Sequence, residues 1–286
     1  FFHSDFKAMP RLSFFDDISK GAKDVLNDNY FEGSKLTMKM KHVDGVNVTA
    51  EARLSNGKPV VNKISSDFCP CDCCNVKKLS IDTNGMIVGD LDVKDVVKDT
   101  TFTVRTLKDY NEAGVKKAAV GAKVMTDSVA VDTAFDIPSQ RYYASLVYGY
   151  KDLMVGSKVY GDLSNSPSAD VAVSYAYKNM VYSCTGYDLF KKADLAVMYD
   201  YDKNTRFSAI CRVSSLNDMP EFGLGVVTKM AKDAEARCKV SSAGEVSACF
   251  KVTVEKKVAF TGSLTVDAAN LSNGNHRTGA GIEFIF

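Results

Sequence analysis

Residues 257–286 read KVAFTGSLTVDAANLSNGNHRTGAGIEFIF, and this stretch decides the fold. Apolar residues occupy every second position of its first part, at Val258, Phe260, Gly262, Leu264 and Val266. A polar run rich in Asn, Ser and Gly follows at residues 270–275, and the alternation returns over residues 280–286. Apolar residues at a period of two on both sides of turn-forming residues are typical of a β-hairpin. The stretch is therefore predicted to form two antiparallel strands.

The same period of two recurs through most of the chain. It is readable over residues 36–40, 46–54, 171–177, 195–201, 207–213, 234–240 and 246–254. Such an all-β pattern fits either a soluble sandwich or a membrane barrel, whose apolar face meets lipid while its polar face lines a water-filled lumen. The apolar positions are rich in Ala, Val and Tyr, with few large core-packing clusters, which favours the barrel. No stretch approaches the ~20 consecutive apolar residues that a membrane helix needs.

Residues 14–28 depart from this period. Phe14, Phe15, Ile18, Ala22, Val25 and Leu26 recur at helical spacing, whereas charged residues take the other face. Ser13, with an acid three positions later, is a candidate helix cap, and Gly33 a candidate stop. We therefore expect an N-terminal segment, residues 1–33, with an amphipathic helix at about 14–28, followed by a β part at 34–286. Residues 107–117 admit a second, weaker helical interpretation.

Two stretches resemble the mitochondrial porin family, the voltage-dependent anion channels. Residues 277–284, RTGAGIEF, are similar to the signal near the C-terminus by which mitochondrial outer-membrane barrels insert. The residues that fit this signal are Arg277, Gly279, Ile282 and Phe284. Residues 17–26, DISKGAKDVL, resemble the helix that lies inside the pore in that family. Shorter matches lie in the family's order at 113–116, 145–150 and 204–207, and the poorest match spans 59–109.

The resemblance implies a membrane β-barrel of about 19 strands with the helix in or against the pore. That number belongs to the family, and the length is a consistency check: about 256 residues remain after the first ~30, at ~9–11 per strand plus turns. The implied function is a passive channel of the mitochondrial outer membrane for nucleotides, phosphate, other small anionic metabolites and ions. Voltage gating is a further expectation.

The resemblance also implies partners and solute contacts. Expected partners are membrane lipid, ATP or ADP, the outer-membrane barrel assembly machinery, and either further copies of the chain or a larger complex. Basic residues of the family's pore helix meet anionic solutes, which points to Lys20 and Lys23. Lys116 ends the run 113–116, which is similar to the strand start near the family's nucleotide contact. A lysine in a wide pore attracts phosphate as a point charge, although these lysines also fit simple solvated surface charges.

Charge limits the expected selectivity. The chain carries 36 Lys and Arg against 35 Asp and Glu, a net charge of +1, which argues against both a nucleic-acid-binding protein and a strongly anion-selective pore. Asp28 stands where the family usually has another lysine, so anion preference and nucleotide affinity are expected to be reduced.

The sequence CPCDCC places Cys69, Cys71, Cys73 and Cys74 within six residues. Closely spaced thiolates suit soft metals, but no second cysteine pair or histidine lies nearby, as a zinc site would require. No metal and no cofactor are expected, and the cluster is interpreted as a lineage-specific strand or turn. A metal or redox role is the alternative. The other cysteines, at 184, 211, 238 and 249, fall in strand rhythm and fit small apolar fillers.

Other classes of protein fit less well. Phosphate-binding loops, nucleophile elbows and zinc-protease motifs are absent from the sequence, so no enzyme is predicted. A protein-import channel of the outer-membrane translocase is one alternative, disfavoured by the short segment before the helix and by the porin match at residues 16–26. A porin-derived structural subunit of a larger membrane assembly is another, suggested by Asp28 and the cysteines. A soluble all-β binding protein is the last.

Overall fold

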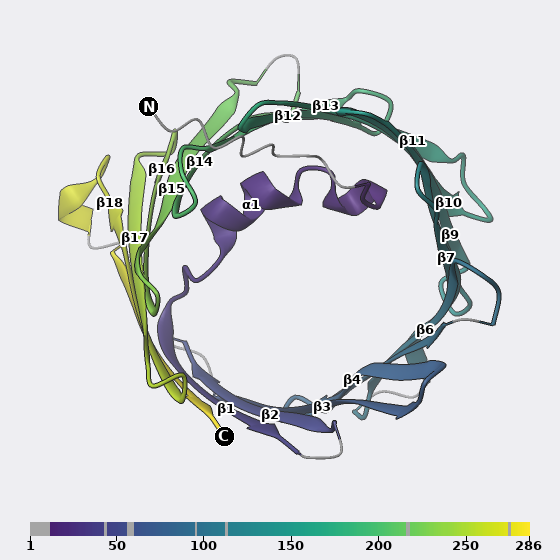
Figure 1. Ribbon diagram of the computed structural model, residues 1–286, viewed down its shortest axis with the longest axis horizontal. Helices are drawn as coiled ribbons and strands as arrows, with labels where there is room; N and C mark the ends of the chain where they lie inside the picture. The colour runs from purple at the N-terminus through teal and green to yellow at the C-terminus, as the bar shows by residue number, and fades with distance from the viewer. Residues whose placement is uncertain are drawn as a thin grey trace.

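A computed structural model of the chain describes residues 12–42, 45–55, 60–94, 96–111, 114–215, 218–273 and 276–286. These residues form one sheet of 19 strands that closes on itself into a barrel, with the helical segment inside the ring (Figure 1). The all-β barrel predicted from the alternation is confirmed. Residues 1–11, with which the N-terminal segment begins, lie outside the described residues.

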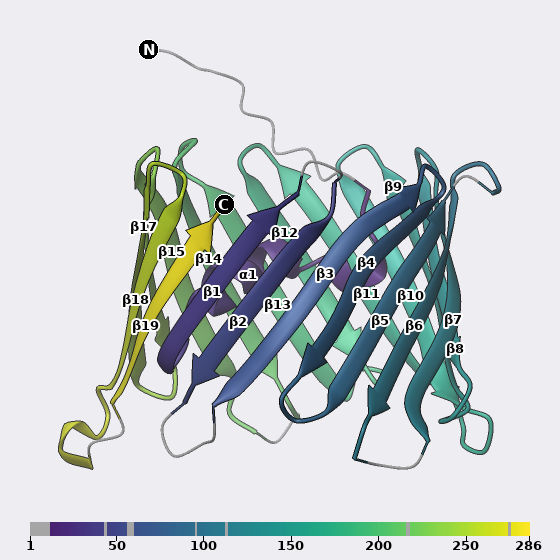
Figure 2. The same cartoon turned by 90° about the horizontal axis from the view of Figure 1, so that it is seen from below.

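Consecutive strands form antiparallel hairpins around the ring, which Figure 2 shows from the side. The elements are η1 Phe15–Asp17, α1 Lys20–Asn27, β1 Gly33–Lys41, β2 Asn47–Leu54, β3 Val61–Cys71, β4 Cys74–Asp82, β5 Met86–Lys94, β6 Thr100–Asp109, β7 Val115–Met125, β8 Val129–Asp136, β9 Arg141–Tyr150, β10 Leu153–Asp162, β11 Ser168–Tyr177, β12 Met180–Tyr187, β13 Lys192–Asp200, β14 Thr205–Val213, β15 Glu221–Ala231, β16 Ala234–Ser241, β17 Glu245–Val254, β18 Val258–Asp267, η2 Leu271–Asn273 and β19 Arg277–Ile285.

Side chains alternate between the lumen and the outer surface. The helical segment packs against alternate residues of the wall, such as Gly156 and Gly225, and these contacts identify the inner face. The opposite positions carry large apolar side chains that are nearly half exposed, among them Phe250, Phe260 and Leu264. A closed barrel pairs the backbone groups of every strand and presents this apolar surface to lipid. The alternation read from the sequence is thus an outer apolar face and a polar lumen.

One pair of strands closes the barrel. β1 and β19 run parallel, with Leu36 opposite Ile282 and Met38 opposite Phe284, whereas every other neighbouring pair is antiparallel. A Cβ atom at Gly279 would lie 2.2 Å from the Phe31 carbonyl oxygen, because the chain entering β1 crosses the inner face of β19 there. The Gly of the predicted insertion signal is therefore a steric requirement of the closure.

The N-terminal helix is interrupted rather than continuous. A short 3-10 helix, η1, precedes α1, and Ile18 and Ser19 form a turn between them. The capping role expected of Ser13 is wrong, since Phe14 holds the cap position and the Ser13 hydroxyl has no hydrogen-bond partner. α1 ends at Asn27, and Asn29 turns the backbone with φ of 66°, so Gly33 begins β1 instead of ending the helix.

Two other expectations concern local structure. The helical interpretation of residues 107–117 is wrong, because residues 107–109 belong to β6 and 115–117 to β7, while 112–113 lie outside the described residues. The predicted turn at 270–275 contains η2, and residues 274–275 lie outside the described part. Within the described residues, no helix is both long and apolar enough to span a bilayer.

Candidate pore and its internal helix

The apolar residues of the helical segment dock on two separate patches of the lumen wall. Phe15 and Ile18 pack with a cluster formed by Ala130, Val147, Met154 and Ala172 on β8 to β11. Ala22 and Leu26 pack with Ala196, Ile210 and Met198 on β13 and β14. Because the two patches lie on different strands, the segment bends at residues 18–19 to reach both.

Small residues on the lumen face make room for this docking. A Cβ atom at Gly156 would lie 3.0 Å from the Phe15 ring, and one at Gly225 would lie 2.6 Å from a Leu26 methyl group. Phe15, Val25 and Leu26 are 5%, 2% and 8% exposed, so the docking removes them from water. Burying one such side chain contributes about 1.5–3 kcal/mol. The helix is therefore held mainly by apolar contact.

Polar contacts fix the helix further. The Lys23 ammonium donates a hydrogen bond of 3.1 Å to the Tyr187 hydroxyl and lies 3.5 Å from a carboxylate oxygen of Asp194 on β13. The Ser208 hydroxyl donates to the Ala22 carbonyl at 3.0 Å. On η1, the Lys158 ammonium of β10 contacts both carboxylate oxygens of Asp16, at 2.7 and 2.9 Å.

Asp28 has a specific partner in the lumen wall. The Arg237 guanidinium of β16 lies 3.8 Å from the Asp28 carboxylate and donates a 2.9 Å hydrogen bond to the Asp24 carbonyl at the end of α1. A cation beside the last carbonyls of a helix also interacts favourably with the helix dipole. The acid that departs from the family's usual lysine thus belongs to the anchorage of α1.

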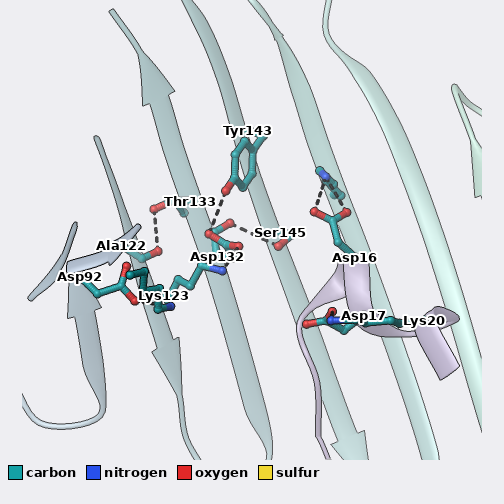
Figure 3. A network of polar contacts seen from close by, with 12 residues as sticks. Asp16, Asp17, Lys20, Asp92, Ala122, Lys123, Asp132, Thr133, Tyr143 and Ser145 are labelled. Carbon is teal, nitrogen blue, oxygen red and sulfur yellow. Dashed lines mark hydrogen bonds and ion pairs between the residues drawn. The ribbon is translucent and has the colours of Figure 1, made fainter. Parts of the chain in front are cut away.

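The three lysines predicted to contact solute lie in different surroundings. Lys20, the first residue of α1, is well exposed and is 3.3 Å from Asp17 (Figure 3). Lys23 is held by the wall contacts described above. Lys116 lies at the start of β7 and donates a 2.8 Å hydrogen bond to Asp109. The structure thus separates Lys116 from the two helix lysines, and only Lys20 presents its ammonium chiefly to the lumen.

Lys116 instead belongs to a basic hollow in the lumen wall that the sequence did not indicate. We use this name for the depression whose cationic residues are Arg105, Lys116, Lys117, Arg141 and Lys158. Its acidic residues are Asp136, Asp162 and Asp170. These cations come from β6, β7, β9 and β10, so only the register between strands brings them together. Period-two alternation predicts that Arg105, Lys117, Arg141 and Lys158 face the lumen. It does not predict which residues of neighbouring strands lie side by side.

Several aspartates of the lumen wall are buried and paired. Asp132 on β8 accepts a hydrogen bond from the Tyr143 hydroxyl at 3.1 Å and lies 3.1 Å from the Lys123 ammonium, while the Ser145 hydroxyl donates to its carbonyl at 3.3 Å (Figure 3). Asp92 pairs with Lys77. A buried carboxylate must be paired to keep its charge. These aspartates therefore neutralise neighbouring cations more than they attract mobile ions.

The residues of the predicted insertion signal all lie on β19. Ile282 and Phe284 face outward, and Arg277 pairs with Glu245 of β17. Cys71, Cys73 and Cys74 lie at the turn between β3 and β4, and Cys69 lies two residues before it. Among the other cysteines, Cys249 is buried on the lumen face of β17, so it is a filler of the inner wall instead of the outer one.

A closed barrel with an apolar outer face, a charged lumen and an internal helix defines a membrane pore. The family model for eukaryotic porins matches residues 12–279, so the chain belongs to the eukaryotic porin family. Members of this family form pores for small solutes in lipid membranes and are channels, not enzymes, which agrees with the sequence-based expectation.

Curated relatives match nearly the whole chain at low identity. The non-selective voltage-gated ion channel VDAC2 of Xenopus laevis is 23% identical over 278 residues, covering 93% of this chain and 96% of that protein. The non-selective voltage-gated ion channel VDAC1 of Rattus norvegicus is 21% identical, with 94% and 96% covered. The chain is thus a divergent member of the family.

Solved structures share the architecture. A variant of the Rh. blastica porin superposes with a TM-score of 0.51 at 10% identity, covering 79% of this chain and 90% of that one. Another variant of the same porin superposes with a TM-score of 0.50, covering 78% of this chain and 89% of that one. At this identity the likeness concerns the fold alone.

Proposed function

We propose that this porin is a passive, weakly anion-preferring channel of the mitochondrial outer membrane for ions and small anionic metabolites such as nucleotides and phosphate. The observation that carries the proposal is the basic hollow, where five cationic side chains meet three carboxylates beside the open lumen. Fixed lumen charges of one sign raise the local concentration of the opposite ion. The remaining lumen charges are of mixed sign, which keeps the preference weak.

Voltage gating is part of the proposal and involves the internal helix. The two docking patches, together with the contacts from Lys158, Lys23 and Arg237, hold the segment at several independent points. A segment that carries six charged residues within 16–28 responds to a transmembrane field, since each elementary charge moved through 100 mV changes the energy by about 2.3 kcal/mol. Movement of the helix against the wall is the proposed gate.

Ion selectivity in a planar bilayer tests the channel proposal. The double variant Arg105→Glu/Lys117→Glu is expected to turn anion preference into cation preference, read as the sign of the reversal potential in a salt gradient. Lys20→Glu is expected to give a smaller shift in the same direction. The control is Lys178→Glu, on the exposed turn between β11 and β12, where the ammonium lies over the Tyr177 ring. A double variant that keeps the original reversal potential contradicts the assignment of the hollow.

Membrane assembly forms the last part of the proposal. We propose that the outer-membrane assembly machinery recognises Ile282 and Phe284, two outward apolar residues of β19, together with Arg277 and Gly279. Ile282→Asp and Phe284→Asp are expected to leave the chain extractable by carbonate from isolated mitochondria, whereas Thr278→Asp, on the same outer face but outside the signal, is expected to be retained. Equal retention of all three variants contradicts this part.

A further inference from the structure

The turn between β3 and β4 gathers three thiols at one rim of the barrel. Cys71 ends β3, Asp72 and Cys73 form the turn, and Cys74 begins β4 directly opposite Cys71. The sulfur atoms of Cys71 and Cys73 are 3.3 Å apart, and those of Cys73 and Cys74 are 3.8 Å apart. All three lie within 4.8 Å of one another. A two-residue hairpin turn is what brings them together.

This spacing matches the sulfur atoms around a single metal ion. Three sulfurs at a metal–sulfur distance of about 2.3 Å lie about 4 Å apart, so the Cys71 and Cys73 sulfurs need to separate by about 0.7 Å and the Cys73 and Cys74 sulfurs by about 0.2 Å. Cys71 and Cys73 are exposed and Cys74 is half-buried, which leaves the group open to an incoming ion. Cys69 is exposed as well but does not belong to the group.

The backbone holds the turn in this arrangement. The Lys94 amide of β5 donates a 2.7 Å hydrogen bond to the Cys73 carbonyl, which ties the turn to a third strand. β3 runs in the same direction as β1, whose last residue Lys41 is bonded to Phe286, so the turn lies on the rim where the C-terminal strand ends (Figure 2). At that rim Cys71 and Cys73 are exposed.

We propose that Cys71, Cys73 and Cys74 form a three-thiolate binding site for one soft metal ion, Cu(I). Thiolates select soft ions, whereas zinc in proteins takes a fourth protein ligand or water. Each coordinating thiol releases its proton to solvent as its sulfur binds, and no change of oxidation state is involved. The site is independent of the channel function, since none of these residues lines the basic hollow or touches the helix.

Anaerobic titration of the reduced, detergent-solubilised full chain with Cu(I), in competition with a chromophoric Cu(I) chelator, tests the proposal. The wild-type chain is expected to take one equivalent, and the triple variant Cys71→Ser/Cys73→Ser/Cys74→Ser to lose it. The matched control, Cys184→Ser/Cys211→Ser/Cys238→Ser on the outer wall, is expected to retain it, as is Cys69→Ser. X-ray absorption is expected to show three sulfur neighbours.

Several results overturn the proposal. They are retention of Cu(I) by the triple variant, loss of Cu(I) by the control, a sulfur coordination number other than three, or preferential binding of Zn(II) over Cu(I) in direct competition. Single-channel conductance of each variant shows that the barrel has formed. Cys73→Ser alone changes one turn residue and is expected to weaken Cu(I) binding at least tenfold, so an unchanged affinity also counts against the site.

Discussion

Two regions of the lumen wall differ in what their inner faces carry. The helix-side wall, formed by β8 to β11 and β13 to β15, presents small or apolar residues such as Gly156, Ala196 and Gly225 to the helical segment. The open wall, formed by β2 to β5, presents charged residues that pair across strands, as Glu51 does with Lys35 of β1. Figure 1 shows the helix lying away from this second region.

The difference teaches how a barrel positions a helix inside its own lumen. Every strand obeys the same outward apolar pattern, so the outer face cannot select a side. The inner face does: glycine and alanine remove side-chain volume where α1 docks, whereas solvated ion pairs on the open wall would have to be desolvated to admit it. The residues of the lumen face therefore determine where the helix docks.

Filling the helix-side wall should have the largest effect. In Gly225→Leu the new side chain takes the place of the Val25 and Leu26 contacts, at a cost of roughly 3 kcal/mol or more. We expect amide hydrogen exchange over residues 20–27 to accelerate about 100-fold while the strands stay protected. Gly262→Leu on β18, where a Cβ atom meets nothing within 4 Å, is the control. Unchanged exchange in Gly225→Leu would show that the wall does not hold α1.

Removing the other anchor should have the next largest effect. Phe15→Ala empties the patch on β8 to β11, a change that costs about 3 kcal/mol in a well-packed core. Exchange of the Asp17 and Ile18 amides, which donate to Phe14 and Phe15, should rise more than that of α1, which has its own patch. Phe14→Ala, at a half-buried position, should have a smaller effect. Equal acceleration of both segments would mean that the patches act as one.

Loss of a charged contact should weaken the anchoring of α1 less than loss of an apolar contact. Lys23→Met loses the contacts with Tyr187 and Asp194, but Asp194 keeps its ion pair with Arg212 at 3.3 Å. We therefore expect the free energy of opening of α1, measured by amide exchange, to fall by about 1 kcal/mol. Lys20→Met loses only an exposed pair with Asp17 and should change the exchange free energy by less than ~0.5 kcal/mol. A larger effect at Lys20 than at Lys23 would reverse the assignment of the anchoring lysine.

Substitutions on the open wall should have the smallest effect on the exchange of α1. Ser65→Leu on β3 adds the same side chain as Gly225→Leu but faces open lumen. The rate of α1 exchange should therefore change by no more than about twofold, which corresponds to the ~0.5 kcal/mol typical of substitutions away from packed features. Single-channel conductance should fall slightly because the side chain narrows the pore. Release of α1 in this variant would remove the distinction between the two walls.

The alternation of residues 258–266 and 280–286 predicted strands with one apolar face, because successive side chains of a strand point to opposite faces. It left both a barrel and a soluble sandwich open, and the abundance of small apolar residues favoured the barrel. The strand number came from the family resemblance. The break at residues 18–19 was not predictable, since helical periodicity places Phe15, Ile18 and Leu26 on one face and does not show that they dock on different strands.

The candidate site was predicted less well for a related reason. Lys20 and Lys23 are equivalent in sequence, and only the docking of α1 on β13 and β14 brings Asp194 beside Lys23. Strand register assembles Arg105, Lys117 and Arg141 in the basic hollow from β6, β7 and β9. Lys116 was predicted from the family resemblance alone, and in the structure it lies in the basic hollow with these three residues.

The parallel seam between β1 and β19 has a consequence for biogenesis. It joins Gly33 to Gly279, so the contact that removes the last two free edges is also the one with the longest sequence separation in the wall. Contacts of this kind form slowly because a long loop must close first. Every intermediate of synthesis thus exposes two unpaired strand edges, which invite pairing with other chains. The two edges stay unpaired until β19 has been made and meets β1.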